Sequence, residues 1–140
     1  MCHYFFIKKS FYSWKSSVNK LIYQDKTGGG DRVLGAFSPD GLAWTKFDSP
    51  ILSNYVSDTQ IVAKYDPEKG KYVGYFRGWD RHEHGRVHGR RAIAYSETDD
   101  FTRWPKPERI VIPDAQDGPA TDIYTNAYTP WPDGGDAHLM

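Results

Sequence analysis

The sequence predicts an all-β fold that is built from repeated units of short antiparallel strands. Aromatic residues make up 16% of the 140 residues, and such side chains are enriched in strands. No stretch of about 12 residues shows the apolar spacing of three or four positions that marks a helix. A pattern of about 60 residues also recurs along the chain, and such repeats are typical of stacked or radial β architectures.

The recurring pattern places an aspartate at the same point of two successive units. Ser57–Ala63 reads SDTQIVA and Thr121–Ala127 reads TDIYTNA, and each is followed by a turn rich in Asp, Gly or Pro. Asp58 and Asp122 occupy the matching places, 64 positions apart. We therefore expect two carboxylates at equivalent structural positions, where two such groups can perform acid–base chemistry together. A turn or strand-start cap is an equally good interpretation of each aspartate alone.

A second pair of matching segments carries an acidic turn and a tryptophan. Ser38–Trp44 (SPDGLAW) is echoed by Ser96–Trp104 (SETDDFTRW), with the tryptophans 60 positions apart. Asp side chains satisfy the backbone amides of such turns, and indole rings pack between sheets. We expect structural roles for these aspartates and tryptophans.

The first unit is expected to contain three short strands. The segments 20–25 and 32–38 are rich in strand formers and enclose a glycine-rich loop at 26–31. Turn residues follow at 39–41, and Trp44 begins a further short strand that reaches Ile51 and Leu52.

The second unit shows the complete order of four strands. Two strands joined by a tight turn are followed by a long polar loop, a third strand, and a fourth strand that contains Pro105 and Pro107. Since proline suits only an edge or an irregular entry, the fourth strand is predicted to be the outer one. The expected strands are 59–65, 71–78, 90–96 and a part of 104–112.

The units are unequal in extent along the chain. A third unit starts at Asp122 and reaches Met140 within its second strand, and the first unit shows no clear first strand. We expect an irregular segment at 1–18 and a partial domain at 19–140 that consists of a half unit, a full unit and a half unit. Open strand edges favour pairing with another chain, so the pattern predicts a fragment of a longer protein or self-association.

The composition argues against several classes of protein. The chain carries 18 basic and 18 acidic side chains, so nothing global attracts it to nucleic acid or to an anionic membrane. Cys2 is the single cysteine, which excludes a disulfide framework and leaves the compartment undetermined. No apolar run approaches the roughly 18 residues of a membrane helix, and residues 1–14 lack the order of a secretory signal. No cofactor is expected.

Three segments carry a resemblance to a known superfamily: SDTQIVAKYDPEKGKYVGYFRG, RRAIAYSETDDFTRWP and TDIYTNAY. With the order of strands and turns around them, they resemble the five-bladed β-propeller glycoside hydrolases, which include arabinanases, β-xylosidases and fructan hydrolases. The likeness covers roughly residues 20–140 and is strongest for predicted glycosyl hydrolase members. It implies an all-β partial propeller of about two blades of four-stranded antiparallel sheet.

The resemblance also implies where a site would lie and what it would do. In that fold the first strand of each blade lines a central channel, so Asp58 and Asp122 would stand at the channel mouth in neighbouring blades. The family's set comprises a base or nucleophile Asp, a helper Asp and an acid Glu from different blades. This chain shows two aspartates and no glutamate at the matching place, which departs from the family pattern.

The segment 77–91 (RGWDRHEHGRVHGRR) is the most unusual in the chain. Five arginines against Asp80 and Glu83 give it a net charge of +3. Arg77, at the end of a strand, is expected to orient substrate, and Trp79 is expected to offer a surface on which sugar rings stack. A solvated loop is the alternative. Its histidines also suggest metal binding, but a glycine-containing loop offers no rigid frame, and we predict no metal site. Its arginines suggest nucleic-acid binding, but the chain as a whole is neutral and the basic cluster is short, so we predict no nucleic-acid partner.

The resemblance therefore implies a carbohydrate-active hydrolase, present here as a fragment, that cleaves glycosidic bonds with paired carboxylates. Asp58 and Asp122 are the candidate catalytic residues, and Arg77, Trp79 and Asn126 are the candidate substrate-binding residues. Asn126 is placed to bond a sugar hydroxyl, with a buried structural amide as the alternative. The partner is expected to be an oligo- or polysaccharide. A non-catalytic carbohydrate-binding module and a protein-interaction propeller remain the alternative functions.

Overall fold

The computed structural model describes residues 5–7, 18–27, 31–80, 89–131 and 137–140. All regular elements within these ranges are β-strands, and no helix is found there. The all-β prediction is thus confirmed. None of the described segments forms an apolar helix long enough to cross a membrane.

The first sheet joins the N-terminal strands in antiparallel order. Its path runs β1-β2-β3-β4, and β5 also pairs with β3. The register is continuous between β2 and β3, from Asn19 opposite Ser38 to Asp25 opposite Arg32. The strands are β1 (Phe5–Ile7), β2 (Asn19–Asp25), β3 (Arg32–Ser38), β4 (Thr45–Lys46) and β5 (Leu52–Ser53).

The second sheet is a meander of four antiparallel strands in the order β6-β7-β8-β9. The hairpin between its two long central strands fixes which side chains share a face, with Trp79 opposite Arg91 and Arg77 opposite Ile93. A short hairpin of β10 and β11 forms a third sheet. The bounds are β6 (Val62–Asp66), β7 (Lys71–Asp80), β8 (Arg90–Thr98), β9 (Glu108–Val111), β10 (Thr129–Pro130) and β11 (His138–Leu139).

The expected strands at 20–25, 32–38, 71–78 and 90–96 are confirmed to within two residues. The segment 1–18, expected to be irregular, contains β1, and the first sheet has five strands where three were expected. The strand expected at 59–65 begins only at Val62. Before Val62 the backbone hydrogen bonds to β7 stop, and a side chain provides one bond in their place. The Ser57 hydroxyl accepts a hydrogen bond from the Arg77 backbone amide at 3.1 Å.

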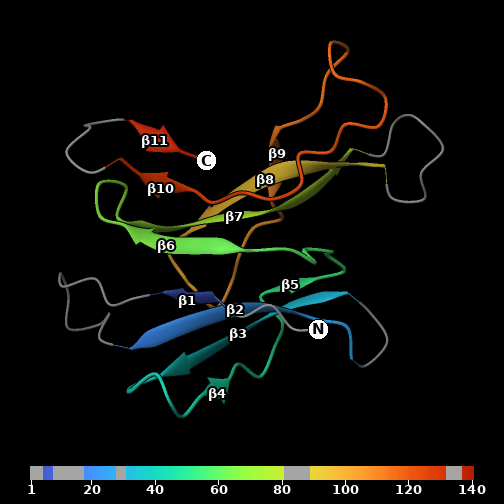
Figure 1. The fold of residues 1–140 in the computed structure, drawn as a ribbon. Coiled ribbons are helices and arrows are strands. Elements are labelled where there is room, and N and C mark those ends of the chain that lie inside the picture. Colours follow the sequence, from blue (N-terminus) through green and yellow to red (C-terminus); the bar gives the residue numbers. More distant parts are fainter. Residues whose placement is uncertain (1–4, 8–17, 28–30, 81–88, 132–136) are drawn as a thin grey trace.

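The sheets are stacked in chain order, with the first strands of successive units side by side (Figure 1). β1 contacts β6, and the Thr59 hydroxyl donates a hydrogen bond to that of Thr125 at 3.2 Å. The segments of the two repeats that carry Asp58 and Asp122 are therefore neighbours in space. No closed sheet is found in the part of the chain that the structure describes.

The main core lies between the first and second sheets. Phe76 of β7 is fully buried, and its ring packs edge-to-face against Trp104 and Tyr55, with centroids 5.6 and 6.1 Å apart. The packing leaves no room at Gly74, where a methyl group would lie 2.6 Å from the rings of Phe76 and Trp104. The buried members of the core are Ile22, Val33, Ile51, Leu52, Ile61, Phe76, Phe101 and Trp104.

Both acidic turns have the local role that their sequence predicts. The Asp40 carboxylate accepts hydrogen bonds from the Ser38 hydroxyl and from the amides of Leu42 and Ala43. These bonds lower the pKa of Asp40, the backbone bonds most strongly. Trp104 is buried and its indole donates to the Phe101 carbonyl at 2.9 Å.

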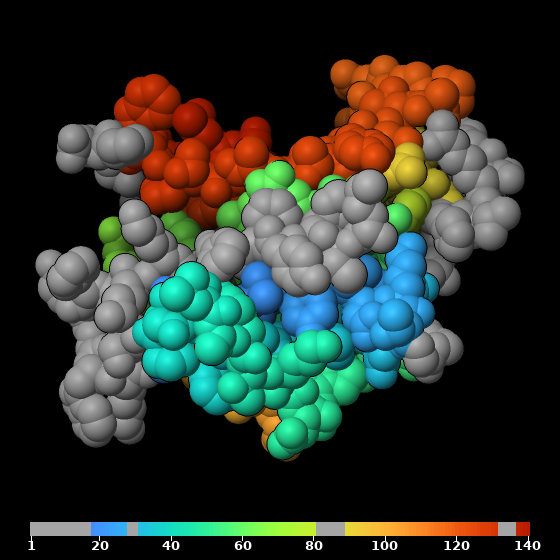
Figure 2. Space-filling model, turned by 60° about the horizontal axis from the view of Figure 1, so that its bottom comes forward, coloured from blue at the N-terminus to red at the C-terminus, as the bar shows by residue number. Residues whose placement is uncertain are grey.

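The surface is uneven on the side that lies away from the first sheet (Figure 1). The C-terminal residues and the segment after β9 form two separate projections with a hollow between them (Figure 2). β9 is the outer strand of the second sheet, and its Ile110 and Val111 are 48% and 40% exposed. Self-association through this edge stays a prediction.

Candidate functional site

The aspartates of the two repeats meet at one end of the second sheet, where β7 ends and β8 begins. Asp58 Oδ1 lies 3.0 Å from Arg77 Nε, and Asp122 Oδ2 lies 2.7 Å from Arg91 Nη1. The other Asp122 oxygen accepts a hydrogen bond from the Arg91 backbone amide at 2.8 Å. Each repeat therefore supplies one carboxylate to one arginine of the same sheet.

Two aromatic rings join these ion pairs into one cluster. The Arg77 guanidinium carbon lies 5.4 Å from the Trp79 ring centroid and 4.9 Å from that of Tyr124. The corresponding distances for Arg91 are 5.5 and 4.9 Å. We call this arrangement the Asp–Arg cluster; its members are Asp58, Arg77, Trp79, Arg91, Asp122 and Tyr124.

The strand register explains why the arginines share a face. Arg77 and Trp79 are two positions apart on β7, and alternate side chains of a strand point to the same side. Arg91 is paired with Trp79 across the hairpin, so it projects from that side too. Tyr124 reaches the same face because the Ile123 amide donates to the Arg91 carbonyl at 3.0 Å.

The position of Asp58 is fixed by its neighbour Ser57, which bridges the two large sheets. The Ser57 amide donates to the Gln24 side chain of β2 at 2.9 Å, and the Ser57 hydroxyl accepts from the Arg77 amide at 3.1 Å. The Tyr55 hydroxyl donates to the Arg77 carbonyl at 2.7 Å. Burial raises the pKa of Tyr55 further above neutral pH, where a tyrosine hydroxyl is already protonated and can donate.

Alanine in place of Ser57 is expected to lower the free energy of unfolding by about 1–3 kcal/mol, because the buried Arg77 amide would lose its acceptor. Ser57 is fully buried, so water cannot replace the hydroxyl without rearrangement. Urea unfolding of the variant measures the effect. Ser53→Ala, at an exposed position, is the matched control. Equal stability of the two variants would contradict the bridging role.

The charges of the cluster act on one another. Arg77 is 2% exposed, and this burial lowers its pKa. Asp58 opposes that shift most strongly, Arg91 reinforces it, and Tyr124 and Asp122 oppose it. Because both carboxylates act on one guanidinium, Asp58 and Asp122 belong to a single electrostatic site.

Several buried polar atoms of the cluster have unused hydrogen-bonding capacity. Arg77 Nε and Asp58 Oδ1 are close enough for an ion pair but are not aligned as a hydrogen bond. Arg77 Nη1 and Arg91 Nε likewise have no hydrogen-bond partner among the described residues. Buried polar groups are nearly always paired, so each such group calls for an explanation.

Asn126 lies in the same segment as Asp122 but is sealed from solvent. It is 1% exposed, and neither atom of its amide has a hydrogen-bond partner within the described ranges. It was predicted either to contact a sugar or to be a satisfied structural amide. The burial of Asn126 agrees with a structural amide, whereas the lack of partners for its amide among the described residues agrees with a contact to a sugar.

The histidine-rich part of the segment 77–91 is not among the residues that the structure describes. His82, Glu83, His84 and His88 lie outside the described residues. In the rest of the chain that the structure describes, no group of three or more histidine, cysteine or acidic side chains is placed to hold a metal ion.

Sequence reasoning missed two members of the cluster. Arg91 was one of five arginines in the unusual segment, and its strand position opposite Trp79 was the available signal. Tyr124 stands two residues after Asp122, at the alternate position that shares a face with it.

Comparisons of the chain with protein-family models, curated proteins and solved structures find no match.

Proposed function

We propose that this chain is a carbohydrate-active protein of the glycoside hydrolase type, with the Asp–Arg cluster as its sugar site. One observation carries the proposal: two repeats bring their carboxylates to a pair of guanidinium groups that share two aromatic rings, and Arg77 Nη1 and Arg91 Nε there have no hydrogen-bond partner among the described residues. A partial five-bladed propeller is the architecture that we propose to go with it. The stacked sheets and adjacent first strands support that architecture.

The chemistry of the cluster matches that of a sugar. Carboxylates accept hydrogen bonds from hydroxyl groups, whereas guanidinium groups donate them, and a sugar hydroxyl can do both. Aromatic rings offer apolar faces to the C–H face of a sugar ring. Tyr124 is 61% exposed, which gives a ligand access to the edge of the cluster.

Hydrolysis of a glycosidic bond requires two carboxyl groups of the enzyme to act in different ways. One carboxylate must attack or activate water, and one carboxylic acid must protonate the leaving oxygen. Arginine donates hydrogen bonds and accepts none, so it suits a carboxylate partner better than a proton-donating acid. We therefore assign Asp58 the carboxylate role and Asp122 the role of its helper. The acid is then a third group outside these two ion pairs.

The same ion pairs favour a second candidate function, a non-catalytic carbohydrate-binding module. Both aspartates face a guanidinium, an arrangement that serves binding without requiring an acid. Binding of a glycan without turnover would select this function. Absence of any glycan affinity would instead favour a protein-interaction propeller.

Calorimetric titration against arabinan, xylan and fructan oligosaccharides tests the sugar site. We expect at least one oligosaccharide to bind, and Asp122→Asn to weaken that binding about tenfold, as for loss of a charge-assisted hydrogen bond. Asp48→Asn, at an exposed position of the first unit, is the matched control. If no oligosaccharide binds, or if both variants bind like the wild type, the proposal is wrong.

A further inference from the structure

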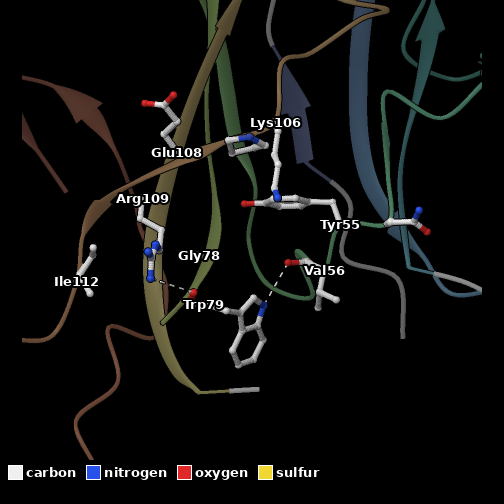
Figure 3. A pocket seen from close by; sticks show the side chains of 10 residues that line it. Tyr55, Val56, Gly78, Trp79, Lys106, Glu108, Arg109 and Ile112 are labelled. Carbon is white, nitrogen blue, oxygen red and sulfur yellow. Dashed lines mark hydrogen bonds between the residues drawn. The ribbon is translucent and has the colours of Figure 1, made fainter. Parts of the chain in front are cut away.

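A second potential site lies beside the Asp–Arg cluster, in a pocket of about 840 Å³ at the end of β7. Tyr55, Val56 and Trp79 line it from one side, and the segment that leads into and through β9 lines it from the other (Figure 3). All of its lining residues belong to the described part of the chain. The pocket combines aromatic and apolar walls with charged side chains from a short segment.

The charged residues of the pocket do not point the same way. The side chains of Lys106 and Arg109 are directed toward the aromatic residues, whereas the Glu108 carboxylate is directed away from them (Figure 3). The Lys106 ammonium has no hydrogen bond or ion pair with any residue that the structure describes. A positive group without a partner therefore faces the pocket.

Arg109 is oriented by the protein and keeps donors for a ligand. Its Nη1 lies 3.2 Å from Asp80 Oδ1 and 3.5 Å from the Trp79 carbonyl oxygen, both of which are acceptors. Asp80 is itself held by Arg90 at 3.2 Å. Since both of these bonds use Nη1, the remaining donors of the guanidinium fork are available at the pocket, and such a fork matches a planar carboxylate.

Trp79 connects this pocket with the Asp–Arg cluster. Its indole lines the pocket and also contacts the guanidinium groups of Arg77 and Arg91. The ring is held in place because its Nε1 donates to the Val56 carbonyl at 3.3 Å. A chain of sugar residues that occupies the cluster would therefore meet the pocket at the same aromatic side chain.

We propose that the pocket binds the carboxylated residue of an acidic saccharide, with the sugar ring against Trp79 and the carboxylate between Lys106 and Arg109. The choice of a saccharide depends on the function proposed above, whereas the choice of a negative charge depends on Lys106 and Arg109 alone. In the Asp–Arg cluster, Arg77 and Arg91 are each matched by a carboxylate, so the cluster has no excess positive charge. The preference for an anion therefore comes from Lys106, which has no ion-pair partner among the described residues.

Calorimetric titration with a galacturonic acid trisaccharide and with its neutral galactose counterpart tests the proposal. We expect the acidic trisaccharide to bind about tenfold more tightly, as expected for charge-assisted hydrogen bonds. Lys106→Gln is expected to remove most of this preference without affecting folding, since Lys106 is exposed. The preference should also shrink with added salt, because salt screens exposed charges. Lys46→Gln, an exposed lysine of β4, is the matched control.

The outcomes separate this proposal from the sugar site of the cluster. Equal affinity for the two trisaccharides, or a preference that survives Lys106→Gln, overturns the pocket and leaves the cluster standing. A preference that is lost in Lys106→Gln while Asp122→Asn binds both trisaccharides like the wild type supports the pocket and overturns the cluster. If neither trisaccharide binds to the wild type, the acidic saccharide proposal is wrong.

Discussion

Alanine in place of Phe76 is expected to lower the free energy of unfolding by about 3–5 kcal/mol, the usual cost of removing a buried aromatic ring. Phe76 is 0% exposed and makes edge-to-face contacts with Tyr55 and Trp104. Its ring therefore joins the second sheet, the segment that leads to Asp58 and the acidic turn of the second unit. Urea unfolding followed by tryptophan fluorescence measures the change.

The cost should depend on burial more than on residue type. Phe37→Ala is the matched control, because Phe37 is 39% exposed and stacks on Phe47 at 6.2 Å. We expect it to cost about 1 kcal/mol, in line with the modest value of one aromatic pair. A loss as large as that of Phe76→Ala would show that the core is not centred between the two large sheets.

Much of the fold could be predicted because its signals are local. Alternating apolar residues and turn chemistry located the long strands, and the SPDGLAW segment showed both the acidic turn and the role of its aspartate. β1 was missed because its three residues, Phe5–Ile7, are identified as a strand only by their partner β2. Short edge strands carry little signal of their own.

The candidate site could be predicted only in part. The echo of Asp58 by Asp122 indicated two related carboxylates, and the structure places Asp58 beside Arg77 and Asp122 beside Arg91 on the same sheet. The pairing of Asp122 with Arg91 depends on the register of the hairpin and on the course of the chain after β9. A single sequence does not specify such long-range contacts, which is also why the pocket of Lys106 and Arg109 was missed.

Asparagine in place of Asp58 is expected to lower turnover of a hydrolysable saccharide by at least about a hundredfold, the typical loss when an acid–base group is removed. Asparagine keeps the shape of the side chain but can neither attack as a carboxylate nor take a proton from water. The Asp58 side chain is 34% exposed while that of its partner Arg77 is 2% exposed, so Asp58 lies at the surface on a buried support. Reducing-sugar release at saturating substrate measures the turnover.

The Asp58→Asn variant loses an ion pair as well as a reactive carboxylate, and it leaves Arg77 buried without its counter-charge. A control must separate these two effects on turnover. Asp25→Asn makes the same change in the pair of Asp25 with Arg32, whose atoms lie 2.9 Å apart in the first sheet. That variant should keep its turnover, and circular dichroism should show that both variants are folded. If a folded Asp58→Asn variant hydrolyses the saccharide at the wild-type rate, Asp58 has no part in the reaction. If it binds the saccharide normally and the wild type shows no turnover, the cluster is a binding site alone.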